Sequence, residues 1–540
     1  MVDIHTLSLD PFKGLNAEVT AKIAELIEGL QEQAKQIADQ AHALEFKDEA
    51  LKLKDAKLEK VLFELGRLKA WKFGAKTEAM SAQQRQLFEE SLAEDQADLE
   101  LQLEALNKAA SKADADEVVP HGEGKRRPRR EMLPEHLRRV EHHHEPQDTN
   151  CPTPDCGQVM VRMGEDVSER LDIVPAEFFV HRHIRGKWVC KCCQILVQES
   201  AHPQVIDKGM PTAGLIAHTL VSRFADHIPY YRQESINARS GVHTPRSTLA
   251  AWSGAGGAAL HPLYEALREF VLSSAVVQAD ETPVNMLDPG AGKTKRAYMW
   301  GYARGVFEDA PAVVYDFCVG RGAQYPMEFL GKWSGTLVRD EYKAYEKVLE
   351  VHGRKAAGCL AHARRKFDEL IKNNASPVGA QAIRRIAEIY RIERELKVLS
   401  PEDRLAQRQA RAGPLWAELE DWMKLERQRV PEGGSTAKAL SYSLNHWDAL
   451  VANLRNGHVP LDNNHLENLM RPWAMGRKAW LFCGSELAGQ RAAVVMSLVV
   501  SARLNGHDPW AYLKDVLTRL PTHPNRHIAD LLPHCWQSNQ

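Results

Sequence analysis

The sequence has almost no net charge, no long apolar run and no N-terminal apolar segment. Its 540 residues carry 70 Lys and Arg against 72 Asp and Glu, a net charge of −2, so any contact with a polyanion must come from local basic patches. No run of about 18 apolar residues predicts a membrane span, and no apolar h-region follows the first residues. We therefore expect a cytoplasmic protein without a membrane partner.

Cysteine is scarce and unevenly placed. There are nine cysteines, an odd number, and five of them lie between Cys151 and Cys193, which argues against a secreted disulfide framework. Cys151 with Cys156 and Cys190 with Cys193 form two pairs, separated by an alternating, strand-like stretch, residues 157–189. Four thiolates in two turns suit structural Zn²⁺, so we predict a zinc-binding β-ribbon over residues 148–200 with Cys192 as a spare. Reduced cysteines without a metal are the alternative.

Proline is missing from residues 15–69, where an apolar residue recurs every seventh position from Ile23 to Leu65. A period of 3.5 residues sustained over seven heptads is typical of a coiled coil. The intervening d positions are polar in the middle of the stretch, which can fix the register. We predict a coiled-coil oligomerisation region over residues 1–112 that forms a homodimer or a higher oligomer. A single helix with an apolar stripe is the alternative.

Two stretches before the central part of the chain are candidates for DNA contacts. Residues 113–147 read as a basic linker whose segment GKRRPRR (Gly124–Arg130) holds a proline that favours an extended, phosphate-binding arm; a solvated tether is equally compatible. Residues 201–270 read as short helices with Thr244 as a cap and Pro245 at a first helical position, either a helix-turn-helix for DNA or a packing element. The candidate DNA contacts are Lys125, Arg126, Arg127, Arg129, Arg130 and Arg246.

From Ser274 the pattern changes to apolar runs separated by turns. Three strands, a helix, two further strands and then helices follow, which is the order of a ribonuclease-H-like α/β core. AVVQADETPV is the first strand, ending at Asp280, and GTLVRDEYKAY is the fourth, ending at Asp340. We place this core at residues 271–485, with a helical insertion at about 368–455 and a C-terminal helical region at 486–540. GAGKTK (Gly290–Lys295) lacks the first glycine of a P-loop and runs into a strand, so we interpret it as a basic hairpin turn.

A third acid lies in the stretch LDNNHLENLMRPWAMGRKAWLFCGS (Leu461–Ser485), where Glu467 follows a helix cap. Two Mg²⁺ ions, or Mn²⁺, need hard oxygen ligands on rigid elements that converge. Asp280, Asp340 and Glu467 occupy such places, so we predict that they are the metal ligands and catalytic residues. Each alone reads as a surface charge, but the strand order argues against that for all three. Their neighbours Glu281 and Glu341 are expected to face the opposite side.

Basic and aromatic residues surround the third acid. Arg471, Arg477 and Lys478 are predicted to hold DNA phosphates, and Trp473 and Trp480 to pack or to stack on displaced bases. His362 on the helix after the fifth strand is interpreted as a core histidine or as a residue that orders the site. Arg364 and Arg365 follow it and are further candidate DNA contacts.

QADETPV, RDEYKAYEKV, GCLAHARRKFDEL and DNNHLENLMRPWAMGRKAWLFCGS resemble the motifs of bacterial DDE transposases of the insertion-sequence sixty-six group. FGAKTEAMS and LLPHCW extend the resemblance over almost the whole chain. It implies a transposase that binds the terminal inverted repeats of its insertion sequence, cuts and joins DNA with Asp280, Asp340 and Glu467 as metal ligands, and works with small accessory proteins of the same element. Two departures are Glu341, where the group more often has glycine, and the wide first cysteine pair.

The resemblance and the residue patterns agree on a multidomain α/β protein with a ribonuclease-H-like core, a helical insertion, an N-terminal coiled coil and a small zinc β-ribbon. Two other functions are compatible with the same residues. One is a ribonuclease-H-like nuclease without strand transfer. The other is a catalytically inactive zinc and coiled-coil regulator that binds DNA.

Overall fold

The computed structural model describes residues 57–65, 93–104 and 133–538, the last with gaps at 134, 136, 147, 152–157, 175–176, 208, 289–292 and 481–482. The chain divides into two compact units, residues 1–73 with 102–121 and residues 74–101 with 122–540. In the first unit the helix 57–65 buries Val61 and Leu65, a predicted d and a predicted a position. Apart from this helix and the helix 93–104, the predicted coiled-coil region 1–112 lies outside the described residues, as does the segment GKRRPRR.

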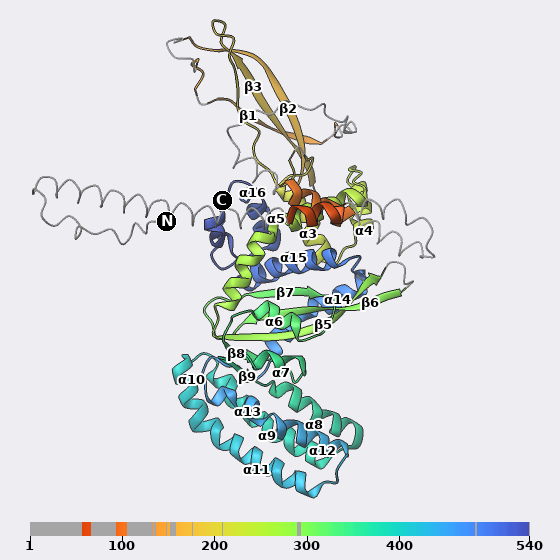
Figure 1. Ribbon diagram of the computed structural model, residues 1–540, viewed down its shortest axis with the longest axis vertical. Helices are drawn as coiled ribbons and strands as arrows, with labels where there is room; N and C mark the ends of the chain where they lie inside the picture. The colour runs from red at the N-terminus through yellow and green to blue at the C-terminus, as the bar shows by residue number, and fades with distance from the viewer. Residues whose placement is uncertain are drawn as a thin grey trace, which may run out of the picture. The chain divides into compact units, whose positions relative to one another are not determined.

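Four strands form the ribbon that carries the cysteines (Figure 1). β2 (Val161–Val174) and β3 (Glu177–Val189) pair antiparallel, and β4 (Leu196–Gln198) pairs with the end of β3. The alternating strands predicted for 157–189 are therefore confirmed. The predicted linker 113–147 is wrong at its C-terminal end, because β1 (Arg138–His144) pairs in parallel with β3. The open edge of β3 offers unpaired backbone groups, and β1 satisfies them.

The helical region after the ribbon contains α3 (Ala213–Leu220), η4 (Val221–Ala225), α4 (Tyr230–Arg239) and α5 (Arg246–Leu272). The prediction of helices is confirmed, but the predicted start of the last one is one residue off. Pro245 is the N-cap of α5 with an extended ψ of 142°, and Thr244 is buried before it. Close packing on α5 requires glycine, because a Cβ at Gly257 would lie 2.3 Å from Arg491 Cγ.

The second sheet has five strands in the order β7-β6-β5-β8-β9. β5 (Val276–Asp288), β6 (Lys293–Arg304) and β7 (Val313–Cys318) are antiparallel neighbours, whereas β8 (Gly335–Val338) and β9 (Arg354–Ala357) continue in parallel from β5. α6 (Gln324–Leu330) and α7 (Ala344–Leu349) connect β7 to β8 and β8 to β9. The predicted succession of three strands, a helix and two strands is confirmed, with α7 as an addition.

The first acid does not end its strand as predicted. β5 pairs in parallel with β8 only as far as Gln278, and then continues as one arm of a hairpin with β6 up to the pair Asp288 and Lys293. Thr294 and Lys295 also pair within this hairpin, so GAGKTK runs into a strand as predicted. Asp280 therefore marks the point where β5 leaves β8, rather than the end of β5.

The outer edge of β7 is covered by α15 (Glu486–Leu504), which packs between the sheet and α5 (Figure 1). Ser501 Oγ accepts a hydrogen bond from Val313 N at 3.0 Å and donates one to Val313 O at 3.0 Å. Ser497 Oγ accepts from Tyr315 N at 2.8 Å. By length and composition α15 is apolar enough to cross a membrane, but most of it is buried in this core, so it is a core helix.

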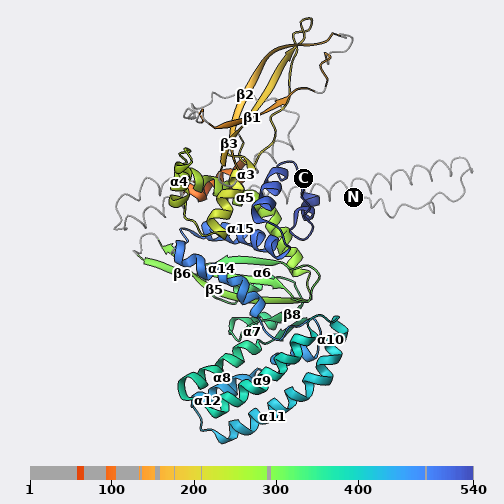
Figure 2. The same cartoon turned by 180° about the vertical axis from the view of Figure 1, so that it is seen from behind.

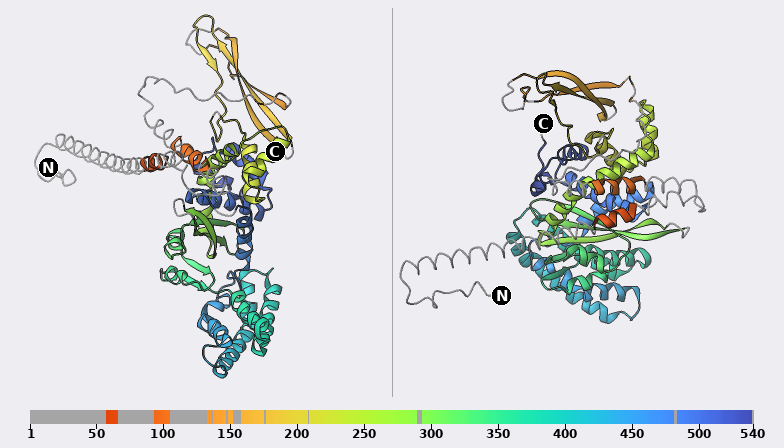
Figure 3. Two further views of the ribbon diagram at one scale, coloured as in Figure 1. Left: turned by 90° about the vertical axis from the view of Figure 1, so that its right-hand side faces the viewer. Right: turned by 45° about the horizontal axis from the view of Figure 1, so that its top comes forward.

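α14 (Asn464–Trp480) packs across β5 and β6 (Figure 2). Between β9 and α14 the chain forms a helical insertion beyond the β9 edge (Figure 3), with its own core around Phe367, Ile389 and Trp416. The insertion begins at Leu360 rather than at about 368, because α8 starts three residues after β9. Its elements are α8 (Leu360–Asn374), α9 (Pro377–Leu396), α10 (Pro401–Gln407), η5 (Arg408–Ala412), α11 (Gly413–Arg429), α12 (Ser435–Asn445), α13 (Trp447–Leu450) and η6 (Ala452–Leu454). The predicted C-terminal helical region contains α15, α16 (Pro509–Arg519) and η7 (Asn525–Leu531).

Candidate active site and zinc centre

Two neighbouring parallel strands bring Asp280 and Asp340 to the same level. Gln278 on β5 is the register partner of Val338 on β8, and each aspartate lies two residues further along its own chain. Parallel strands point their carboxyl ends to one edge, so both acids lie at the same edge, where the pairing of β5 with β8 ends. This juxtaposition follows from the backbone register alone.

Asn463 ties the helix of the third acid to β5. Its side chain accepts a hydrogen bond from Gln278 Nε2 at 3.0 Å and donates one to Ala279 O at 2.9 Å. Asn463 is 1% exposed, and its carbonyl accepts a hydrogen bond from Glu467 N at 3.0 Å. Glu467 thus lies one helical turn after Asn463, whose side chain is hydrogen-bonded to the residue before Asp280. The sequence marks Asn463 only as a turn and cap residue.

The electrostatics indicate that the three acids influence one another. Burial is the largest cause of a raised pKa at Asp280. Together with the negative charges of Glu281, Asp340 and Glu467, it brings this pKa to about 8. Carboxylates gathered in a partly buried site oppose each other's ionisation. Asp280 therefore keeps its proton at neutral pH unless a cation offsets these charges.

The acidic neighbours of the two aspartates have partners of their own. Glu281 accepts a hydrogen bond from Arg321 Nε at 2.7 Å and another from the Tyr345 hydroxyl at 3.1 Å. Glu341 accepts from Arg339 Nη1 at 2.7 Å and lies 2.8 Å from His446 Nδ1. Glu341 therefore links the end of β8 to the helical insertion.

Glu467 lies against basic side chains. Its Oε1 is 3.6 Å from His362 Nδ1 and its Oε2 is 3.4 Å from Arg365 Nη2. Among the described residues, two groups of three or more His, Cys, Asp or Glu side chains have potential ligand atoms that all lie within 4.8 Å of one another. One of them is Cys359, His362 and Glu467, and neither contains Asp280 or Asp340. Glu467 therefore lies against His362 and Arg365 rather than in one ligand group with the two aspartates. His362 therefore belongs to the site.

The carboxylates fit a divalent cation better than the thiol does. Glu467 Oε1 is buried without a hydrogen-bond partner, and Asp280 retains a proton for want of a positive neighbour. A hard cation held by Asp280, Asp340 and Glu467 would satisfy both groups. Burial raises the pKa of Cys359 to about 12, so this thiol stays protonated and serves as an acceptor for Asn463 N at 3.2 Å.

The predicted phosphate contacts have different surroundings. Arg364, Arg365 and Arg471 are exposed. Arg477 donates to Pro283 O at 2.8 Å, so its guanidinium is attached to the β5–β6 hairpin, and Arg246 lies 3.5 Å from Glu234. Outside the described residues are Lys125, Arg126, Arg127, Arg129, Arg130 and the side chain of Lys478.

Trp473 is a core residue. It is 0% exposed and meets Tyr315 edge-on, with ring centroids 5.4 Å apart. The first of the two predicted roles, packing, therefore holds for Trp473, because α14 turns this face toward the sheet. The side chain of Trp480 lies outside the described residues.

Three of the four predicted zinc ligands meet at the end of the ribbon where Val161 pairs with Val189, opposite the end that packs on the helical region. Cys151, Cys190 and Cys193 place their sulfur atoms within 4.8 Å of one another, whereas Cys192 is exposed. Cys193 N donates to Cys190 Sγ at 3.5 Å, and Gln194 adopts a positive φ of 54°. A tight turn that aims backbone N–H groups at sulfur suits a thiolate bound to Zn²⁺. Cys156, the fourth predicted ligand, lies outside the described residues.

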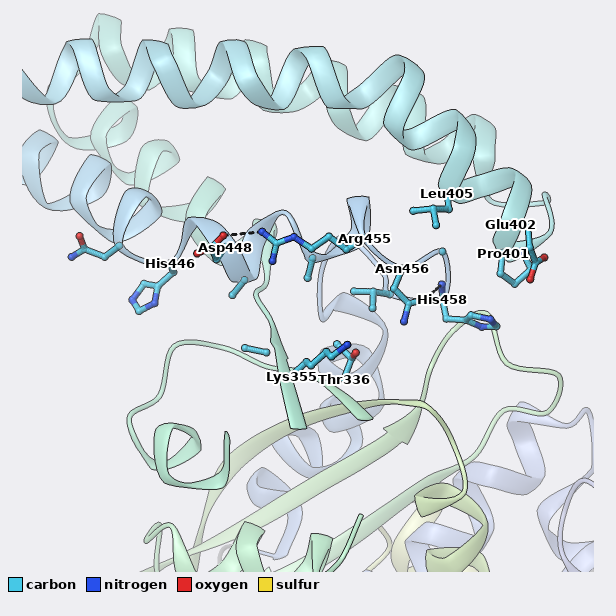
Figure 4. A pocket seen from close by; sticks show the side chains of 16 residues that line it. Thr336, Lys355, Pro401, Glu402, Leu405, His446, Asp448, Arg455, Asn456 and His458 are labelled. Atoms are coloured by element: carbon cyan, nitrogen blue, oxygen red, sulfur yellow. Dashed lines mark hydrogen bonds and ion pairs between the residues drawn. The ribbon is translucent and has the colours of Figure 1, made fainter. Parts of the chain in front are cut away.

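A cavity lies beside β9 on the side of the insertion (Figure 4). Lys355 from β9 and the ion pair of Arg455 with Asp448, at 2.8 Å, line it. His446, which contacts Glu341, forms part of its wall. Its lining contains charges of both signs and none of the predicted ligands or DNA contacts, so it is distinct from the candidate active site.

Comparison with known proteins decides the family. Residues 208–491, more than half of the chain, match the model described as Transposase IS66 family. The chain belongs to the IS66 family of transposases. Residues 148–194 match the zinc-finger binding domain of transposase IS66, and residues 497–534 match the IS66 C-terminal element. Residues 62–141 match a model described as Transposase C of IS166 homeodomain.

Full-length relatives support this membership. Three proteins of Sinorhizobium fredii, each named only as an uncharacterized protein, are similar to this chain. y4jD is 37% identical over 425 residues, covering 76% of this chain and 82% of the relative. For y4qI the identity is 36% over 425 residues, with coverage of 76% and 78%, and for y4hP it is 33% over 475 residues, with coverage of 81% and 84%. The predicted family is confirmed, with a zinc finger and DNA handling as its shared properties.

Proposed function

We propose that this IS66-family protein is a DDE transposase that binds the terminal inverted repeats of its own insertion sequence and catalyses metal-dependent strand cleavage and strand transfer. The observation that carries the proposal is that Asp280 on β5 and Asp340 after β8 each lie two residues beyond the register pair Gln278 and Val338, with Glu467 attached through Asn463. The strand order, with three antiparallel strands followed by two parallel ones, supports the proposal of a ribonuclease-H-like core. Metal-dependent phosphoryl transfer requires oxygen ligands that converge on the ions.

Asp280, Asp340 and Glu467 would hold two Mg²⁺ ions, or Mn²⁺. When bound, the ions supply charge stabilisation at the phosphate and activate the attacking oxygen. Glu281 does not take part, because Arg321 and Tyr345 hold its carboxylate. His362 and Arg365 keep the Glu467 carboxylate at the site, and we assign them a positioning role.

The reaction has two steps on this reading. In the first, water attacks the phosphorus at the element end, the bond from phosphorus to the 3′ oxygen breaks, and a free 3′-hydroxyl remains on the element. In the second, that hydroxyl attacks a target phosphodiester and displaces its 3′ oxygen, without a covalent enzyme intermediate. Arg364 on α8 and Arg471 on α14 are exposed and would bind backbone phosphates. The zinc ribbon and the N-terminal helices would serve end recognition and oligomerisation.

The proposal is tested with Glu467→Gln. We expect this variant to bind element-end DNA as the wild type does and to lose nicking by at least about 100-fold, because an amide cannot replace the carboxylate ligand. Glu369→Gln is the matched control, since Glu369 is an exposed acid on α8. Unchanged nicking by Glu467→Gln would refute the assignment.

Assays of DNA binding, cleavage and joining also distinguish the proposed transposase from two other functions. A ribonuclease-H-like nuclease would cleave DNA but would not join a supplied 3′-hydroxyl end to a target. A catalytically inactive regulator would bind DNA regardless of Mg²⁺ and yield no cleaved product. Strand transfer that requires Mg²⁺ or Mn²⁺ distinguishes the proposed transposase from both.

A further inference from the structure

Four histidines form a column of imidazole rings on one face of the ribbon. His142 and His144 come from β1, and His181 and His183 come from β3, with His142 the register partner of His183. The ring centroids are 5.0 Å apart for His142 and His181, 5.0 Å for His142 and His183, and 5.4 Å for His144 and His183. All four side chains are half-buried, so solvent ions reach the column.

Ring nitrogens meet in two pairs. His142 Nε2 lies 2.7 Å from His181 Nδ1, and His144 Nε2 lies 3.1 Å from His183 Nδ1. Asp172 on β2 is 3% exposed, and its Oδ2 lies 2.8 Å from His181 Nε2. A carboxylate at that distance accepts the Nε2 proton, which leaves the lone pair of His181 on Nδ1, toward His142. This is the tautomer that a metal ligand requires.

We propose that the pairs His142–His181 and His144–His183 each bind a divalent transition-metal ion, such as Zn²⁺, Ni²⁺ or Cu²⁺, with water completing the coordination. Imidazole is a preferred donor for these ions. Metal–nitrogen bonds of about 2.0–2.1 Å place two imidazole nitrogens of one ion about 3 Å apart. The observed separations of 2.7 and 3.1 Å need only small ring rotations to match this value.

These sites are separate from the cysteine centre. His183 and Cys190 are seven positions apart along an extended chain, a distance of about 20 Å along a strand. The donors also differ in kind, since thiolates hold the structural zinc and imidazoles hold the proposed ions. The two sets can therefore be loaded and emptied independently.

The consequence is a metal-dependent attachment of β1. β1 pairs with β3 on one side only, and it is the first strand after the basic segment 124–130 in the sequence. An ion held by one ligand from each strand stabilises that pairing by binding the folded ribbon only. Metal occupancy would then fix where the chain leaves the basic segment and enters the ribbon.

The test uses the untagged, zinc-loaded full-length protein titrated with Ni²⁺ by calorimetry, with retained zinc measured afterwards. We expect each of His142→Gln and His144→Gln to bind one Ni²⁺ per chain fewer than the wild type, and Ni²⁺ to raise the thermal unfolding midpoint of the wild type. Asp172→Asn should weaken one of the two sites by roughly 10–100-fold and leave the other unchanged. His143→Gln is the matched control, because alternate residues of β1 point to opposite faces.

Each result decides the proposal. Loss of one site per variant, with His143→Gln unchanged, supports it. If one variant fails to fold, the other still tests its own pair. No Ni²⁺ binding to a folded wild-type ribbon, or equal loss in His143→Gln, would show that the column is a hydrogen-bond relay only.

Discussion

The carboxyl group of Asp280 is surrounded by Glu281, Asp340 and Glu467. Burial, together with these charges, raises its pKa from the ordinary 3.8 to about 8. Between these values the unfolded chain has released a proton that the folded chain retains. The stabilising contribution of the protonated group is therefore complete at low pH and is lost as the pH rises through about 8. Burial acts in the same direction on Glu281, whose pKa is raised to about 7.

We therefore predict that the protein without added Mg²⁺ becomes less stable between about pH 5 and about pH 8, and that Asp280→Asn loses less stability over that range. The neutral amide has no proton to give up. The measurement is the thermal unfolding midpoint, in which each kcal/mol corresponds to about 2–4 °C for a domain of this size. Added Mg²⁺ should restore the wild type at about pH 8 and should do little for Asp280→Asn. Identical pH profiles would contradict this account.

Asn463 offers a second prediction. Asn463→Ala removes the two side-chain hydrogen bonds to Gln278 and Ala279 O and leaves these buried groups unsatisfied. We expect a loss of about 1–3 kcal/mol in the free energy of unfolding, with nicking reduced and DNA binding retained. Urea unfolding and a nicking assay measure the two effects. The control is Asn464→Ala, because Asn464 is an exposed neighbour whose side chain donates a hydrogen bond to Asp462.

The sequence alone placed Asp280 on the first strand of the core and Glu467 on its helix, where the structure has them. It placed Asp340 at the end of the fourth strand, which stops two residues earlier, at Val338. Each acid directly follows or opens a strongly patterned segment, so its place depends on local signals. The role of Asn463 could not be predicted, because its partners lie more than 180 residues away. The histidine column escaped prediction for the same reason, since adjacent histidines on β1 become a set only when β3 aligns with them.

At the scale of elements, the zinc turn after β3 allows a matched comparison. Cys190→Ser should abolish zinc binding and destabilise the ribbon, because a structural zinc contributes directly to folding. Cys192→Ser should bind zinc as the wild type does, since Cys192 is exposed and outside the cysteine cluster. Zinc content per chain by elemental analysis checks both. Equal zinc loss in the two variants would show that the ligand assignment is wrong.

The order of strands and helices in the catalytic core was predictable from apolar periodicity, but two strand boundaries were not. β5 continues past Asp280 because β6 supplies a hairpin partner, and β1 exists because β3 has an open edge. Both extensions depend on pairing between segments rather than on the propensity of the residues. Local patterns predict that a strand exists, while its partner decides where it ends.

At the scale of the whole molecule, a chain with a net charge of −2 buries an unusual concentration of charge. Arg491 on α15 is 2% exposed and contacts Glu94 and Asp95 at 2.9 Å and Asp98 at 3.1 Å. These acids lie on the helix 93–104, almost 400 residues earlier in the chain. The arginine therefore fastens an N-terminal helix to the core of the catalytic region.

Arg491→Met should cost about 3–5 kcal/mol of stability, because it leaves buried carboxylates without their cation. We also expect faster hydrogen exchange in residues 93–104 than in the wild type. Calorimetry and mass spectrometry measure the two effects. Arg503→Met on the same helix is the control, and a protein that keeps slow exchange in 93–104 after Arg491→Met would contradict the assignment.

The hydroxyls of Ser497 and Ser501 fill the backbone hydrogen-bonding positions of Val313 and Tyr315 on β7. A strand of another polypeptide, whether a peptide or a second transposase, therefore cannot extend the sheet by pairing with these backbone groups. An exposed sheet edge can pair with the edge of another copy. Proteins that assemble as several copies on one DNA molecule must avoid such pairing. At this edge of the sheet, two small side chains prevent it.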